Sequence, residues 1–341
     1  MQEKNGKKNS KWIGKLPIRE LSKILSKITT IYTPSVITGP GPGEDAGIID
    51  LGNCMLVSHV DPITEAGETT GRLAVIVASN DVAVSGARPR WAQVLLLLPP
   101  GYPLDKVEAL ASEIGNTARE LGIEVIGGHT EYTPGLEKPI VAVYVMGCTC
   151  RECIVPTGNA RAGDVVVQIG YAGQEGAFIL ANDFEILLRE RGVPQETIEY
   201  LKRGVRLSVV DVAVELAEKG LVHSMHDATE GGLLGALVEV ALASSKTLRI
   251  DKRKIVVDRR VAEACKVLNV DPLKLISSGT LIVTAPPENL DSILEIVRRH
   301  GYVAAPIGTV EEGDAKLVLV DGEKIMELYE PPEDEISRFW K

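Results

Sequence analysis

Residues 41–81 read GPGEDAGIIDLGNCMLVSHVDPITEAGETTGRLAVIVASND, and acidic residues mark three different kinds of boundary in this stretch. Glu44 and Asp45 follow a loop rich in glycine and proline. Asp61 closes an apolar alternation that predicts a strand, and Asp81 falls within a helix-like pattern. Carboxylates from a loop, a strand and a helix suit Mg²⁺ or Mn²⁺. These hard cations take oxygen ligands and are often coordinated by protein carboxylates and substrate phosphates together. We therefore predict a cation site from these four acids, the alternative being that each is simply solvated.

A helix is expected over residues 68–85, because apolar residues recur there at intervals of three and four. Asn80 and Asp81 are a polar pair in this mostly apolar helix. A buried polar pair needs partners, which a metal or a nucleotide would supply. We expect Asn80 to bind the cofactor, with a hydrogen bond to a neighbouring strand as the alternative.

A pair of glycines follows the apolar run 123–126, which predicts a strand. Gly127 and Gly128 would let a ligand approach the backbone closely at the strand end. His129 and Glu131 come directly after them and are candidate catalytic residues, although this histidine could equally be structural.

A second glycine pair lies at a predicted strand–helix junction in the second half. Thr229, Gly231 and Gly232 precede an apolar helix over residues 233–243. A helix start presents free N–H groups and a positive dipole end to an anion, and glycines leave room for a phosphate. We predict phosphate binding there, with His226 and Asp227 beside it as candidate catalytic residues.

The motifs together resemble the superfamily of aminoimidazole ribonucleotide synthetase. GEDAG, NDVAVSGARP, GGHTE, HDATEGG and DPLKLISSGTL occur in the family's order between about residues 40 and 320. NDVAVSGARP and DPLKLISSGTL look most like the branch of the hydrogenase-maturation protein HypE. GGHTE and HDATEGG depart from the forms usual in that branch.

The resemblance implies two α/β domains, dimerisation through the first domain, and ATP bound in a groove between the domains or at the dimer interface. It also implies Mg²⁺ ions that join the ATP phosphates to Asp45, Asp61 and Asp81. The chemistry shared by such proteins activates an oxygen by phosphorylation or transfers a phosphoryl group. Such catalysis depends mostly on positioning and charge neutralisation.

The end of the printed sequence departs from the HypE pattern. HypE carries its reacting group on a cysteine in a short C-terminal tail, whereas the last cysteine here is Cys265. Cyanide-ligand synthesis is therefore in doubt, and we expect an ATP-using phosphoryl-transfer enzyme or a phosphohydrolase that acts on a nucleotide or a phosphorylated small molecule. A HypE-type dehydratase with a cysteine supplied by a partner protein and a nucleotide-binding regulator without catalysis are the alternatives.

Composition narrows the class of protein. The 341 residues are 45% hydrophobic and only 4% aromatic, so the core must be aliphatic. The formal net charge of −10 argues against a nucleic-acid partner, because such surfaces are basic. No apolar run approaches the length of a membrane span.

Cys148, Cys150 and Cys153 form the only cluster among five cysteines, and free thiols or one local disulfide is expected. We expect a cytoplasmic protein.

Four segments are expected along the chain: a disordered basic tail over 1–15, a metal- and nucleotide-binding α/β domain over 16–155, a second α/β domain over 156–330, and a polar tail over 331–341. The charged stretch 183–202 is expected to be mobile. Three strands of the first domain are apolar on both faces or nearly so, and one helix layer cannot cover both faces of their sheet. A homodimer or higher homo-oligomer is therefore expected.

Overall fold

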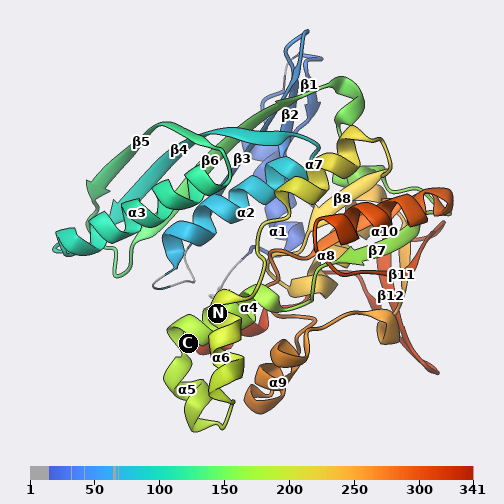
Figure 1. Ribbon diagram of the computed structural model, residues 1–341. Helices are drawn as coiled ribbons and strands as arrows, with labels where there is room; N and C mark the ends of the chain where they lie inside the picture. Colours follow the sequence, from blue (N-terminus) through green and yellow to red (C-terminus); the bar gives the residue numbers. More distant parts are fainter. Residues whose placement is uncertain (1–14, 32, 42, 64–66, 68, 341) are drawn as a thin grey trace, which may run out of the picture.

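The computed structural model describes residues 15–31, 33–41, 43–63, 67 and 69–340 (Figure 1). Apart from Lys15, the predicted N-terminal tail lies outside these residues, as does Glu68 at the expected start of a helix. Two sheets organise the described part of the chain, which confirms the mixed α/β fold class.

The first sheet has six strands in the order β1-β2-β3-β6-β4-β5. Neighbouring strands are antiparallel except β4 and β5, which α3 connects in parallel. The elements of this half are α1 (Ile18–Ile28), β1 (Val36–Thr38), β2 (Gly47–Asp50), β3 (Met55–Ile63), α2 (Thr70–Val84), β4 (Arg88–Leu98), α3 (Leu104–Glu120), β5 (Glu124–Tyr132) and β6 (Ile140–Thr149).

Helices α2 and α3 cover one face of this sheet (Figure 1). The strands alternate accordingly, because successive side chains point to opposite faces. In β4, Ala92, Leu96 and Leu98 are buried whereas Gln93 and Leu95 are exposed, so the helices cover only one face of this strand in the single chain.

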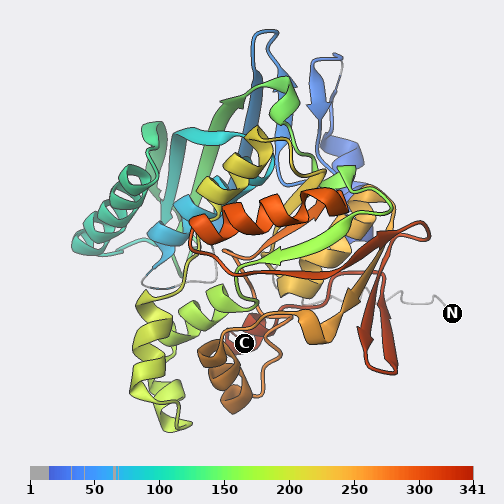
Figure 2. The same ribbon diagram turned by 45° about the vertical axis from the view of Figure 1, so that its right-hand side comes forward.

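The second sheet has seven strands in the order β13-β12-β9-β11-β7-β10-β8. Adjacent residues of its central strands enter different cores: Val167 and Val283 pack with α7 and α10, whereas Val166 and Ile282 pack with α8. Helices thus cover both faces of this sheet (Figure 2). The elements are β7 (Val165–Ile169), α4 (Gln174–Asp183), α5 (Glu185–Glu190), α6 (Gln195–Arg203), α7 (Val210–Glu218), β8 (Ser224–Asp227), α8 (Gly232–Ser244), β9 (Thr247–Asp251), α9 (Arg259–Leu268), β10 (Leu281–Ala285), α10 (Leu290–Arg299), β11 (Ala304–Glu311), β12 (Lys316–Asp321) and β13 (Lys324–Leu328).

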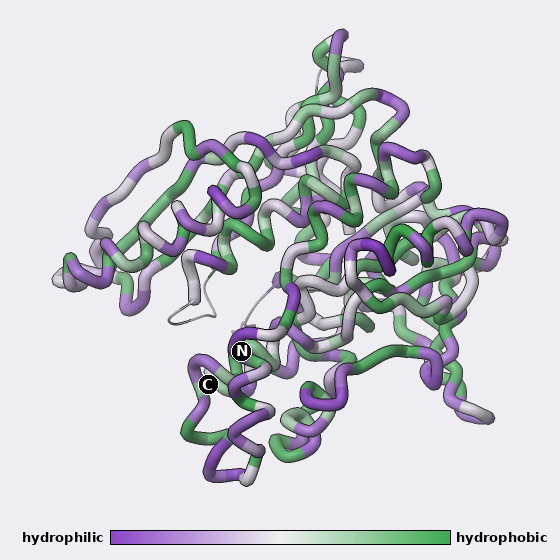
Figure 3. Tube along the Cα trace, viewed as in Figure 1, coloured by the Kyte–Doolittle hydropathy of each residue, from purple (hydrophilic) through white to green (hydrophobic). Residues whose placement is uncertain are grey.

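The charged stretch 183–202 is folded, contrary to expectation. It forms α5 and α6, which are largely hydrophilic in sequence (Figure 3), while Leu188, Ile198 and Leu201 are fully buried. The end of the chain also packs rather than forming a polar tail. Ile336 is fully buried, and the ring of Trp340 lies 5.0 Å from that of Phe184.

Helix α2 belongs to both halves. Its Ala74 and Ala78 pack in the core of the first sheet, whereas Leu73 and Ile76 pack with α4, α6 and α9 of the second half. Mostly apolar all round, α2 is buried along almost its whole length. In the described part of the chain, no helix has the length and apolarity needed to cross a membrane.

Candidate metal and phosphate site

Two groups of possible metal ligands meet at Asp81. His59, Asp61 and Asp81 form one group, and Asp45, Asp81 and Asp227 form the other. Within each group the ligand atoms lie within 4.8 Å of one another. The structure therefore brings together four of the predicted acids, and Asp81 is placed to serve two neighbouring cations.

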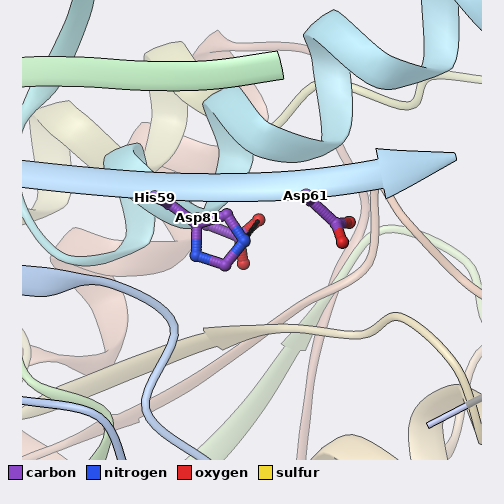
Figure 4. A group of neighbouring side chains, drawn as sticks. All are labelled: His59, Asp61 and Asp81. Carbon is purple, nitrogen blue, oxygen red and sulfur yellow. Dashed lines mark ion pairs between the residues drawn. The ribbon is translucent and has the colours of Figure 1, made fainter. Parts of the chain in front are cut away.

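Strand β3 and helix α2 position the first group (Figure 4). His59 and Asp61 are two residues apart on β3, so their side chains share a face of the strand. Asp81 approaches them from the covering helix, with its Oδ2 atom 3.4 Å from Nε2 of His59. Asp61 was expected to close the strand, but β3 continues to Ile63.

Asp227 at the end of β8 is the clearest sign that the second group fits a cation. Both of its carboxylate oxygens are buried, and among the described residues neither has a hydrogen-bond partner. A buried carboxylate without a partner is costly, and oxygen ligands suit Mg²⁺ or Mn²⁺. The donors of this group therefore match the cations that the sequence predicts.

Burial and the mutual repulsion of the acids raise their pKa values. Burial, followed by repulsion from Asp227 and Asp45, raises the pKa of Asp81 well above its usual range. Burial is also the main cause that raises the pKa of Asp61 to about 7. A bound cation would oppose both effects by favouring the charged carboxylates.

His226 joins the two halves through a buried chain of charges. Its Nδ1 lies 2.6 Å from Oδ1 of Asp45, and its Nε2 lies 3.0 Å from Oε2 of Glu239. Burial alone would lower the pKa of His226, but Asp45 and Glu239 outweigh it and raise the pKa to about 10. The ring is therefore a cation at neutral pH, which holds Asp45 in place. The hydroxyl of Thr157 donates a further hydrogen bond to Asp45.

The predicted phosphate cradle at the start of α8 already has protein partners. The N–H of Gly231 donates to the Asp334 carboxylate at 2.7 Å, and that of Gly232 donates to the carbonyl of Thr229. The positive φ of both glycines makes the tight turn into the helix. These two groups are therefore not free donors in the described structure. The hydroxyl of Thr229 accepts a hydrogen bond from Lys15.

Asn80 does not face the acidic groups. Its side-chain amide donates to the carbonyl of Leu207 and accepts from the N–H of Val209, both at 2.9 Å. The fully buried side chain thus joins α2 to the second half, and the predicted cofactor-binding role has no support in these contacts. Glu44 stands outside both candidate metal groups, and its carboxylate accepts from the N–H of Gly158.

The GGHTE motif lies within a strand instead of at its end. Gly127, Gly128, His129 and Glu131 all belong to the exposed edge strand β5, and neither His129 nor Glu131 is in a candidate metal group. A Cβ at Gly128 would meet the Val94 carbonyl oxygen at 2.0 Å, so glycine allows close approach of β4. A hollow of about 410 Å³ lies between β5 and α3, and both glycines and His129 line it.

Three further residues complete the acidic region and were missed in the sequence. No local pattern in the sequence marks His59, Glu239 or Lys15 as part of the site. The side chain of Lys15 lies 3.4 Å from Glu239 and 3.5 Å from Glu230. Burial alone would lower the pKa of Lys15, but Glu239 and Glu230 outweigh it and raise the pKa.

A small cavity between the halves adjoins Asp61. Residues from both halves line it, including Leu73, Glu175, Glu230 and Ser278. Burial raises the pKa of Glu175 to about 8, and its carboxylate accepts from the N–H of Ser278. This cavity places polar groups next to the acidic region.

The cysteine cluster lies apart from these groups. Cys150 and Cys153 form a local disulfide, as one of the two expected arrangements. Cys54 and Cys148 are free thiols whose Sγ atoms lie 3.2 Å apart.

Comparison with known proteins places the chain in a family. The models for the N-terminal and C-terminal domains of AIR synthase related protein match residues 43–149 and 161–320. Carbamoyl dehydratase HypE of Azotobacter vinelandii is 31% identical over 280 residues, which cover 77% of this chain and 76% of the relative. The chain belongs to the AIR synthase-related family. The predicted resemblance is thereby confirmed.

Other relatives of this AIR synthase-related protein point to the HypE branch. A protein of Methanocaldococcus jannaschii that is provisionally named a hydrogenase expression/formation protein is 29% identical over 309 residues, covering 86% of this chain and 88% of the relative. Among solved structures, HypE in complex with ATP has a TM-score of 0.66 at 24% identity and covers 91% of both chains. A HypE–HypF complex has a TM-score of 0.73 at 20% identity, covering 91% of this chain and 97% of the other. Thiamine monophosphate kinase of Aquifex aeolicus has a TM-score of 0.67 at 23% identity, covering 89% and 97%. These structures share the fold of the AIR synthase-related protein.

Proposed function

We propose that this protein is an ATP-using enzyme that requires Mg²⁺ or Mn²⁺ and acts on a phosphate ester or anhydride. One observation carries the proposal: Asp81 is shared by two groups of possible metal ligands, and Asp227 in one of them is buried without a partner among the described residues. The resemblance in fold to an ATP-bound HypE and to a kinase supports ATP as the nucleotide.

The residues of the chain would act mainly by holding charges in place. Asp45, Asp81 and Asp227 would hold one cation, and His59, Asp61 and Asp81 a second. When bound, the cations supply neutralisation of phosphate charge. His226 holds Asp45 in position through Nδ1, and Glu239 orients the ring by its contact with Nε2. Such a site transfers a phosphoryl group by positioning and needs no nucleophile from the protein.

The test measures phosphate release from ATP and from simple phosphate monoesters with Mg²⁺ or Mn²⁺. Asp81→Asn should reduce turnover by roughly a hundredfold or more, since even indirect partners of a metal can be worth 10- to 100-fold. Asp211→Asn is the control, because Asp211 is an exposed acid that pairs with Arg88. Folded protein that hydrolyses nothing with either metal would refute the proposal. ATP binding without turnover would instead support the non-catalytic regulator.

A HypE-type dehydratase remains the second candidate. The relative at 31% identity carries the name carbamoyl dehydratase, and the chain shares its fold with a HypE–HypF complex. In this case ATP would be consumed only when a partner protein presents a carbamoylated cysteine. If the protein turns over ATP equally fast with and without such a partner, the requirement for a carbamoylated cysteine is excluded.

A further inference from the structure

Lys15 places a positive charge at the acidic region from the far end of the chain. Its ammonium group donates to Oγ1 of Thr229 at 2.9 Å and lies 3.4 Å from Oε1 of Glu239 and 3.5 Å from Oε2 of Glu230. More than 200 residues separate it from these partners in sequence. About half of the side chain, 49%, remains exposed.

The acids of both halves surround this single ammonium group. Glu230 and Glu239 pair with it directly, and Asp61 and Asp81 also act on it through their charge. The last two are members of the candidate metal groups. Lys15 therefore supplies positive charge next to the position where a divalent cation would bind.

A bound cation would change the balance of charges around Lys15. Two positive charges near Asp61 and Asp81 would repel each other, and the ammonium would then favour an anion as its partner. ATP held by the cations would present such an anion, and lysine is a common phosphate-binding residue because its charge is compact. The hydroxyl of Thr229 would keep the ammonium on the side of α8 that faces this region.

We propose that Lys15 is a phosphate-binding residue that pairs with acids in the free protein and with ATP phosphate oxygens when cations are bound. The inference rests on the proposed function, because it requires nucleotide and cation at this site. The proposal predicts opposite effects of removing Lys15 on the binding of a cation alone and on the binding of ATP. Removing the ammonium should strengthen the binding of a cation alone, since a competing charge is lost, and should weaken the binding of ATP.

The experiment compares Lys15→Ala with Lys23→Ala, which removes the same charge from an exposed lysine on α1 that pairs with Glu20. Mn²⁺ is titrated into the protein without nucleotide, and binding is followed by the loss of the electron paramagnetic resonance signal of free Mn²⁺. ATP is titrated by calorimetry with Mg²⁺ present. In Lys15→Ala we expect roughly two- to fivefold tighter Mn²⁺ binding and roughly tenfold to a hundredfold weaker ATP binding. Lys15→Arg should restore much of the ATP affinity, and thermal melting verifies that each variant is folded.

The outcomes separate this inference from the proposed function. If the wild type binds neither Mn²⁺ nor ATP, the proposed function fails and the inference fails with it. If the wild type binds both but Lys15→Ala leaves both affinities unchanged, only the inference is wrong. If both affinities fall together in Lys15→Ala, Lys15 is a structural link between the N-terminal segment and α8, and the phosphate role is overturned.

Discussion

His226 Nδ1 lies 2.6 Å from Oδ1 of Asp45, and this buried contact crosses from the second half of the chain to the first. Glu239 on α8 holds the other ring nitrogen at 3.0 Å. One imidazolium thus pairs with two carboxylates that are themselves almost completely buried. The contact links the stability of the fold to the position of a candidate metal ligand.

Replacing His226 should therefore destabilise the protein strongly. His226→Gln leaves the Asp45 carboxylate buried without its cation and leaves Glu239 with Lys15 as its only cationic partner among the described residues, at a cost of about 3–5 kcal/mol in the free energy of unfolding. Urea denaturation in EDTA measures this loss without any contribution from metal. His300→Gln is the matched control, because His300 pairs with Glu215 near the surface and should cost about 1 kcal/mol or less. Equal losses in the two variants would contradict the prediction.

The shared position of Asp81 predicts a pattern of metal stoichiometry. The wild type should bind two Mn²⁺ ions per chain, Asp61→Asn and Asp227→Asn one each, and Asp81→Asn none, because only Asp81 belongs to both groups. Equilibrium dialysis followed by elemental analysis gives these numbers directly. Retention of two ions by Asp81→Asn would rule out the arrangement, whereas Asp211→Asn should behave like the wild type.

Cation binding should depend on pH because burial raises the pKa of Asp61 to about 7. Below this pH the folded, metal-free protein holds a proton on Asp61, so Mn²⁺ must displace it; above this pH the carboxylate is already charged. The contribution of Asp61 to the affinity should therefore rise with pH and level off above about 7, and the stability that its proton confers on the metal-free protein should be lost over the same rise. Calorimetry in buffers of different ionisation enthalpy detects the released proton. Asp61→Asn should have a flatter pH profile, and an unchanged profile would assign the proton elsewhere.

The homo-oligomer stays a prediction, which exposed apolar residues on strands of the first sheet support. Val60, Val125 and Ile126 expose 56%, 48% and 55% of their surface, and β5 has an open edge among the described residues. Exposed apolar strands at an edge are typical of an interface. Ile126→Asp should shift the protein towards the 36.7 kDa monomer in light scattering, whereas Ile186→Asp on α5 should not. A monomeric wild type at micromolar concentration would contradict the prediction.

The sequence predicted the acids that local signals mark. Asp45 follows a glycine-rich loop, Asp81 interrupts an apolar helix, and Asp227 precedes a glycine turn, so each stood out within a few residues of its own position. The structure brings these three together at Asp81. Helix α3, which follows Pro103 and ends at Glu120, is of the same kind, because its periodicity and its ends are local properties of the sequence.

What the sequence could not supply depends on contacts between distant segments. His59 gains significance only beside Asp81, and Glu239 only beside His226. Gly128 looked like a ligand contact, but it serves the close approach of β4. The helices of residues 183–202 were missed because their charged surface outweighed the few apolar residues, such as Leu188 and Ile198, that hold them in place.

Helix α2 has a consequence for how this protein could be divided or recombined. Leu73 and Ile76 complete a core made largely by the second half, and Asn80 satisfies the backbone of Leu207 and Val209. A fragment cut between the two family domains would expose those leucine and isoleucine side chains and leave the Asn80 amide without its partners. Exchange of one half for that of a relative would meet the same mismatch. Helix α2 therefore ties the two halves together, even though sequence comparison recognises two domains.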